Sequence, residues 1–465
     1  MITVNLYSIK KHLYNLIVIV LLVTMTSVHA FNPYSTDELD QLEKEFIQQI
    51  NLSDQVIRNP ITSQYINHLG RELARAGRMQ SPYFFIVKSN EINAFAGPGG
   101  YIGINTALIL ATRNESELAA VMAHELSHVR LHHLYRAIQH EKQMRIPMLA
   151  SLLASIALGV IDPTLASGAV MASLTGFAQD SINFTRSNEK EADRIGIGML
   201  TTAGFDPRSM VTFFQTMQQN SRYYYTANIP AILRTHPLDA DRISEAENRI
   251  GRPIHTVADN LDYHLFKELI RNTTYTNPKD SLDFYQLECN KQNIQPACAY
   301  GKALTLINTD KFTQAKTTLL PLLAQNPENL FYQFAMVDAQ IGCKEYKEAL
   351  SQLQAMQTNY PDSYAVLMNY ATGLIEMGQN AQATAILLKG FRQYKQDLPL
   401  CESLARAQAA SHQKAYAYFT ESQCYLIQGR RFDALRQLNQ AKLFAKTDRY
   451  LMARIEAMID QIKSS

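Results

Sequence analysis

Two histidines and a glutamate stand at the spacing of a catalytic metal site. Residues 124–128 read His-Glu-Leu-Ser-His. On a helix, positions i and i+4 lie on one face, one turn apart, so His124 and His128 can bind the same zinc ion. Glu125 follows the first histidine and can take a proton from a water that the metal activates. The spacing predicts one zinc ion per chain and hydrolytic chemistry, with Glu125 as the catalytic base.

A catalytic zinc site needs a third protein ligand and one open position. The segment Asn-Glu-Lys-Glu-Ala-Asp, which ends at Asp193, offers the best candidate in Glu189. Glu189 and Asp193 share one face of the expected helix, so Glu189 can bind zinc while Asp193 hydrogen-bonds a ligand imidazole. Glu191 is the rival carboxylate, but its offset of two residues turns it toward another side of the helix.

A longer zinc motif, HExxHxxGxxH, would supply its third ligand from the same segment. It needs glycine at position 131 and histidine at position 134, where this chain has Leu131 and Leu134. We therefore expect His132 and His133 to support the structure or a ligand and not to bind the metal themselves.

Local sequence patterns indicate which elements position these residues. The helix that carries the motif is expected to run from Leu118 to about His133, after a capping pattern formed by Asn114 and Glu117. Residues 93–96 lead into a turn at Pro-Gly-Gly. Apolar periodicity and β-forming runs predict helices at 36–50, 61–76, 189–203 and 239–249 and strands at 83–87 and 101–105.

Residues 146–178 are strongly apolar and are divided by Asp162 and Pro163. Each half is shorter than the ~20 apolar residues that span a bilayer. Two interpretations stay open: a packed helical hairpin, and a surface that contacts a membrane or a hydrophobic client. A membrane-embedded protease with this segment inserted is a third interpretation.

The C-terminal part of the chain repeats with a period of 34 residues. Residues of three kinds recur at this spacing: alanine at Ala315, Ala349 and Ala383, leucine at Leu319, Leu353 and Leu387, and proline at Pro327 and Pro361. This pattern is the signature of tetratricopeptide (TPR) helix pairs, in which small residues lie where helices cross and proline follows the second helix. The agreement weakens after residue 390 and partly resumes at 429–441. We expect a solenoid whose concave surface binds peptides or proteins.

Charge and cysteine content exclude some functions. Lysine and arginine total 44 against 42 acidic residues, so no surplus of positive charge supports nucleic-acid binding. No Cys-x-x-Cys pair exists, which argues against a zinc ribbon or a thioredoxin-like site. Disulfides and buried free thiols stay open as alternatives for Cys289, Cys298, Cys343, Cys401 and Cys424.

The first 30 residues have the pattern of a secretory signal. A positively charged region with Lys10 and Lys11 precedes an apolar run at 16–23. Val28 and Ala30 occupy the −3 and −1 positions of a cleavage site. The apolar run is shorter than the ~20 residues of a membrane span, which favours cleavage near Ala30 over an uncleaved anchor. The mature chain would then begin in an exported compartment.

These motifs together resemble the gluzincin peptidases of the HtpX/Oma type. The resemblance rests on Asn-Ala-Phe-Ala at 93–96, Pro-Gly-Gly-Tyr-Ile at 98–102, the HELSH segment and the Glu-x-x-x-Asp spacing that ends at Asp193. Taken with the predicted signal, the apolar segment at 146–178 and the C-terminal repeats, the resemblance implies a periplasmic zinc endopeptidase and chaperone that promotes the assembly of outer-membrane β-barrel proteins or degrades misassembled forms. The implied partners are unfolded or stalled outer-membrane proteins and the β-barrel assembly machinery, reached through the repeats.

The resemblance also implies roles for two further segments. An edge strand to which extended substrate adds by β-augmentation would comprise Tyr101, Ile102, Gly103, Ile104 and Asn105. His236, which the sequence alone classes as a loop histidine, would be catalytic and a latch that fills the open zinc position at rest. The alternative function is a mainly non-catalytic TPR chaperone or scaffold with a latched zinc site.

The expected fold class is mostly α. An α+β zincin metalloprotease domain with a small sheet is followed by an all-α TPR-like solenoid. The predicted boundaries are a signal peptide at 1–30, the zinc metalloprotease domain at 31–260 with the apolar hairpin at 146–178, linker helices at 261–295 and the repeats at 296–465.

Overall fold

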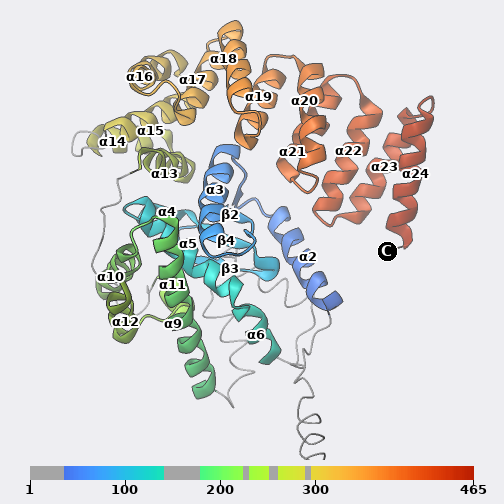
Figure 1. The fold of residues 1–465 in the computed structure, drawn as a ribbon. Coiled ribbons are helices and arrows are strands. Elements are labelled where there is room, and N and C mark those ends of the chain that lie inside the picture. Colours follow the sequence, from blue (N-terminus) through green and yellow to red (C-terminus); the bar gives the residue numbers. More distant parts are fainter. Residues whose placement is uncertain (1–35, 141–177, 224–229, 251–259, 289–294, 465) are drawn as a thin grey trace, which may run out of the picture.

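A computed structural model describes residues 36–140, 178–223, 230–250, 260–288 and 295–464. The predicted signal at 1–30, nearly all of the apolar segment 146–178 and Cys289 lie outside the described residues. Within the described ranges, no helix is long and apolar enough to cross a bilayer. Figure 1 shows a mainly helical molecule with one small sheet beneath an arc of paired helices, which confirms the predicted fold class.

The sheet has four strands in the order β1-β2-β4-β3. β2 and β4 run parallel, whereas β1 pairs with β2 and β3 pairs with β4 in antiparallel fashion. Every residue of β2 and β4 is buried, and the continuous apolar run of β2 is typical of a central strand covered on both faces. Their bounds are Val56–Ile57 for β1, Phe84–Val87 for β2, Ala94–Ala96 for β3 and Ile102–Asn105 for β4.

The prediction of an edge strand at Tyr101–Asn105 is wrong. β4 has neighbours on both sides, because the segment expected only to lead into a turn pairs with it as β3. Gly103 makes this pairing possible, since a Cβ there would lie 2.1 Å from the Phe95 ring. The backbone groups of β4 are therefore taken up by the sheet, and the edge strands are β3 (Ala94–Ala96), next to β4, and β1, next to β2.

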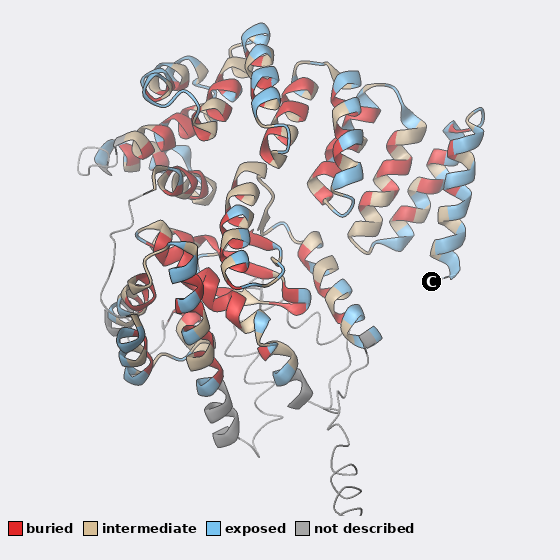
Figure 2. Ribbon diagram, viewed as in Figure 1, coloured by how far each residue is buried: buried red, intermediate tan, exposed pale blue. Residues whose placement is uncertain are grey.

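Helix α5 runs through the centre of the N-terminal part. It is buried from Ser116 to Ser127 and packs against α3, α9, α10 and β3. Figure 2 shows these buried segments surrounded by helices with exposed outer faces. The helices of this part are α2 (Thr36–Leu52), α3 (Pro60–Ala76), α4 (Thr106–Ala111), α5 (Glu115–Arg130), α6 (His133–His140), α9 (Ala178–Ala203), α10 (Arg208–Tyr223), α11 (Ala231–Thr235) and α12 (Ala240–Ile250), and Pro98–Gly100 forms the short 3-10 helix η1.

The C-terminal helices form antiparallel pairs in sequence order. α17, α19, α21 and α23 begin at residues 330, 364, 398 and 431, so the period continues beyond residue 390, where the sequence pattern weakens. The predicted crossing residues Ala315, Ala349 and Ala383 are fully buried. The helices are α13 (Leu261–Thr274), α14 (Pro278–Glu288), α15 (Gln295–Ile307), α16 (Phe312–Gln325), α17 (Leu330–Gly342), α18 (Tyr346–Asn359), α19 (Tyr364–Glu376), α20 (Asn380–Gln393), α21 (Leu398–Ala410), α22 (Lys414–Ile427), α23 (Arg431–Phe444) and α24 (Arg449–Ser464).

The two parts share buried surface. One hydrophobic cluster extends from Ile66 on α3 through Leu126 on α5 and Phe266 on α13 to Phe331 on α17. Farther along the arc, α19 packs on α3. The boundaries at 260 and 295 stay a prediction, because the core continues across them.

Two cysteines of the repeats are joined. Cys401 on α21 and Cys424 on α22 form a disulfide that links the two helices of one pair. Cys298 is also disulfide-bonded, while Cys343 is a free, partly exposed thiol. These bonds resolve part of the pairing that spacing alone left open, and they agree with an oxidising compartment.

Candidate metal centre

Helix α5 presents both motif histidines to one point. The Asn114 side chain accepts a hydrogen bond from the Glu117 N–H and caps the start of the helix, as the sequence predicts. One turn apart, His124 and His128 place their Nε2 atoms 3.0 Å from each other. The helix is buried around the motif, so these imidazoles are partly shielded from water.

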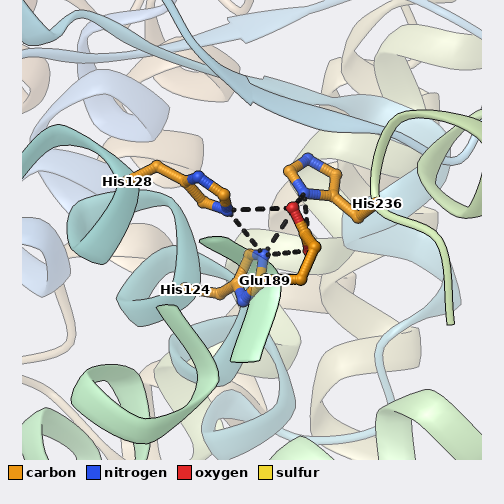
Figure 3. Close-up of side chains that lie close together, drawn as sticks. All are labelled: His124, His128, Glu189 and His236. Carbon is orange, nitrogen blue, oxygen red and sulfur yellow. Dashed lines mark hydrogen bonds and ion pairs between the residues drawn. The ribbon is translucent and has the colours of Figure 1, made fainter. Parts of the chain in front are cut away.

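Two other elements complete a cluster of four residues (Figure 3). Glu189 on α9 lies 3.2 Å from His124 Nε2 and 3.4 Å from His128 Nε2. His236, directly after α11, places Nδ1 3.1 Å from Glu189 Oε1 and 3.3 Å from His124 Nε2. One ligand atom from each residue lies within 4.8 Å of the others.

The outer ring nitrogens of the two motif histidines are held by further partners. His124 Nδ1 lies 2.9 Å from Asp193 Oδ1, as the helical spacing predicts. His128 Nδ1 lies 2.9 Å from His133 Nδ1, and His133 Nε2 lies 3.6 Å from Glu191. Such partners fix ring orientation and leave Nε2 available to a metal.

The rival carboxylate, Glu191, and the neighbouring histidine, His132, lie outside the metal cluster. Glu191 faces His133, outside the cluster of four, and also lies 3.9 Å from Arg136. His132 is exposed and ends α5 with a φ of 54°, a left-handed conformation that stops the helix. Neither side chain joins the cluster.

The electrostatics of the cluster favour a bound cation. Burial lowers the pKa of His124, but Asp193 and Glu189 outweigh it and raise the pKa to about 10. Burial and the neighbouring His124 charge hold the pKa of His128 well below its usual range. Burial raises the pKa of Glu189, but His236 and His124 outweigh it and keep the carboxyl ionised. A metal at this point would replace a proton that the carboxylates already attract.

Sequence reasoning missed the residue that holds the two carboxylates. Arg242 on α12 is 2% exposed, and its Nε and Nη2 donate to Asp193 at 2.8 and 2.9 Å. Its Nη1 lies 3.0 Å from Glu189 and donates to the Pro237 carbonyl. The surrounding helix has a mixed-charge pattern typical of a solvent-exposed helix, so no local signal separates this arginine from its exposed neighbours.

Comparison with known proteins agrees with this geometry. Residues 60–250 match the model of peptidase family M48. The chain is 34% identical over 430 residues to the beta-barrel assembly-enhancing protease of Escherichia coli K12, covering 91% of this chain and 87% of that protein. A putative beta-barrel assembly-enhancing protease of Vibrio cholerae is 32% identical over 90% of this chain and 87% of that protein. Bovine mitochondrial metalloendopeptidase OMA1 is 27% identical over 36% of this chain and 32% of its own length.

The chain belongs to the beta-barrel assembly-enhancing proteases of peptidase family M48. It is therefore a metallopeptidase. The residues present suit a metal of this family, because two imidazole nitrogens from α5 and a carboxylate from α9 converge on one point. A ring nitrogen of His236 lies at the same point, where it could fill the fourth position around the metal.

A cleft of about 510 Å³ leads to the centre of this M48 site. Its lining includes Glu125, His128, Glu189 and His236, together with Phe95 of β3. Residues 101–105 do not line this cleft, which agrees with their place inside the sheet. The Glu125 carboxylate oxygens are buried without a hydrogen-bond partner, although Oε1 lies 3.4 Å from His236 Nε2.

Proposed function

We propose that this protein is a zinc endopeptidase and chaperone that acts in the periplasm on outer-membrane β-barrel proteins. Its clients would be unfolded or stalled barrel precursors, whose assembly it promotes or whose misassembled forms it degrades. The names of its relatives and the metal centre support the proposal. The predicted signal supports export, and the repeats are the proposed surface for clients and the β-barrel assembly machinery.

His124, His128 and Glu189 are the proposed zinc ligands. A bound zinc ion supplies Lewis-acid polarisation of the scissile carbonyl and lowers the pKa of a nearby water. Glu125 is the proposed base that takes the proton of the attacking water and delivers it to the leaving amine. Its buried carboxylate, without a hydrogen-bond partner, suits a group that must exchange a proton with reactants.

Extended substrate is proposed to add to β3. Asn93 accepts a hydrogen bond from Asn105 across β3 and β4, and Gly97 donates one to Tyr101. Because such bonds alternate along an antiparallel pair, the backbone groups of Ala94 and Ala96 face the free edge. A substrate strand paired there would run beside the cleft that ends at Glu125.

His236 is the proposed latch and the proposed donor to the developing oxyanion. In the resting arrangement its Nδ1 shares the point on which the other ligand atoms converge. Among the described residues, Arg242 is the arginine that contacts the cluster, but its side chain already donates to Asp193 and to the Pro237 carbonyl and lies 3.0 Å from Glu189. His236 therefore has to leave the metal position before substrate can be cut, and it remains close to the reacting carbonyl.

The observation that carries the proposal is the convergence of α5, α9 and the residue after α11 on one point. Glu125→Gln is expected to keep one zinc per chain but to lose at least about 100-fold in cleavage of an unfolded barrel protein, because the base is removed. Metal analysis and a gel-based cleavage assay measure both quantities. A Glu125→Gln protein that binds zinc and cleaves at the wild-type rate contradicts the base assignment.

The second candidate function is a mainly non-catalytic chaperone. It is favoured by the position of His236, whose Nδ1 lies among the proposed ligand atoms. His236→Ala is expected to bind a zinc-chelating hydroxamate at least about tenfold more tightly, because the competing side chain is gone. Calorimetric titration of both proteins measures the difference. Unchanged hydroxamate affinity would show that His236 does not act as a latch.

A further inference from the structure

A large cavity separates the protease part from the repeats, away from the metal centre. It has a volume of about 1070 Å³ and is bounded by α3, the start of α13 and the loops that precede α17, α19 and α21. None of the four clustered metal-centre residues lines it. The cavity is therefore a separate feature of the molecule that the peptidase chemistry does not explain.

Hydrogen bonds connect the walls of this cavity, one set between α3 and the repeats and one between α13 and the residue before α17. The Gln64 side-chain oxygen on α3 accepts hydrogen bonds from Ser363 Oγ and the Ala365 N–H, both at 2.8 Å. On another side, Asn329 Nδ2 donates to Asp262 Oδ1 at 2.6 Å. A cavity braced in this way is preformed, so a ligand would not have to open it.

The walls of the cavity are rich in tyrosine. Tyr65 stacks on Phe266 with ring centroids 4.3 Å apart, and Tyr364 meets Tyr394 edge to face at 5.3 Å. Tyr83, which also lines the cavity, is half exposed. Rigid rings with a hydroxyl at one end supply contact area at low entropic cost and are common in peptide-binding surfaces. The tyrosines that line the cavity are Tyr65, Tyr83, Tyr360, Tyr364 and Tyr394.

The formal charge of the walls is strongly negative. Among the described residues that line the cavity, Arg71 is the only lysine or arginine and His68 is the only histidine. Burial raises the pKa of the Asp397 carboxyl even though it accepts the Tyr364 hydroxyl and the Leu400 N–H. A ligand cation beside Asp397 would favour its ionised form and offset the cost of burying that charge. The carboxylates that line the cavity are Glu72, Glu115, Asp262, Glu328, Asp362 and Asp397.

We propose that this cavity is a docking site for an extended, lysine- or arginine-rich segment of a protein partner. The tyrosine rings would contact the peptide backbone and the stems of its long side chains, and the carboxylates would pair with its cations. A cleft lined by one sign of charge concentrates ligands of the opposite sign. The inference goes beyond the proposed peptidase function, because it concerns recognition at a distance from the zinc ligands.

The test uses a fluorescent peptide of alternating lysine and serine, with serine-only and glutamate–serine peptides as probes of charge. Binding is measured by anisotropy with the full protein in a Glu125→Gln background, so that the peptide is not cut. The lysine peptide is expected to bind at least about tenfold more tightly than either probe at low salt. Equal binding of the three peptides overturns the proposal.

Three variants locate the site. The pair Asp362→Asn and Glu328→Gln is expected to weaken lysine-peptide binding about tenfold, and Arg71→Glu is expected to strengthen it several-fold. The matched control is Glu348→Gln with Asp460→Asn, which removes the same charge from exposed positions elsewhere on the repeats. Circular dichroism checks that each variant is folded, and Arg71→Glu still decides the matter if the lining pair is not. Equal weakening by the control pair, or weaker binding by Arg71→Glu, overturns the cavity assignment.

Discussion

At the scale of single residues, the metal centre depends on side chains that support the proposed ligands. His124 hydrogen-bonds Asp193 and His128 hydrogen-bonds His133, so each imidazole has a fixed orientation. Arg242 in turn neutralises Asp193 and Glu189 where both are buried. Burying two carboxylates costs much free energy unless a cation pairs with them.

Removal of Arg242 should therefore destabilise the whole fold. Arg242→Leu is expected to lower the free energy of unfolding by about 3–5 kcal/mol, because it leaves buried carboxylates without their partner. Urea denaturation of the metal-free protein measures the loss. The matched control is Arg436→Ala, which breaks an exposed pair with Asp433 and should cost less than about 1 kcal/mol. Equal losses in the two variants would show that Arg242 is not the main neutralising group.

At the scale of elements, α13 joins the protease part to the repeats through polar as well as apolar contacts. Lys267 on α13 donates to the carbonyl of Thr112 after α4, and Tyr263 donates to the same oxygen at 2.8 Å. Burial lowers the pKa of Lys267 to about 8. The folded state therefore disfavours the charged ammonium relative to the unfolded chain.

This shift predicts a pH dependence of stability with a definite sign. Between about pH 8 and the ordinary lysine value, the folded state has lost the Lys267 proton while the unfolded state still holds it, so the unfolded state binds more protons and stability rises with pH. Lys267→Met should remove this contribution. Urea unfolding of both proteins from pH 7.5 to 10 measures it as a difference of slopes. Parallel curves for the two proteins would contradict the shifted lysine.

The elements also show what the sequence could and could not predict. Spacing along one helix predicted the convergence of His124 and His128 and the pairing of Asp193 with a ligand ring, because helical geometry is local. The order of the strands is not local. β3 is only three residues long, and its pairing with β4 depends on Gly103 making room for Phe95. Arg242 was missed for the same reason, since its carboxylate partners lie on α9.

At the scale of the whole molecule, the repeats curve back and contact the protease part of the chain. α19 contacts α3, and the Asn51 side chain on α2 donates to the carbonyl of Ile427 at the end of α22. Figure 1 shows the resulting arc above the sheet and α5. The period of 34 residues predicted the helix pairs, but neither the contacts with α2 and α3 nor the acidic cavity between the two parts follows from a repeat pattern.

The central claim is that Glu189, with His124 and His128, holds the metal that the peptidase needs. The most direct measurement compares Glu189→Gln with Glu191→Gln, two changes of the same kind on the same helix. Zinc content and cleavage of an unfolded barrel protein are measured for both. We expect Glu191→Gln to keep one zinc per chain and most activity, and Glu189→Gln to lose at least about 100-fold in zinc affinity along with its activity. Full zinc occupancy and activity in Glu189→Gln, or their loss in Glu191→Gln alone, would contradict the account.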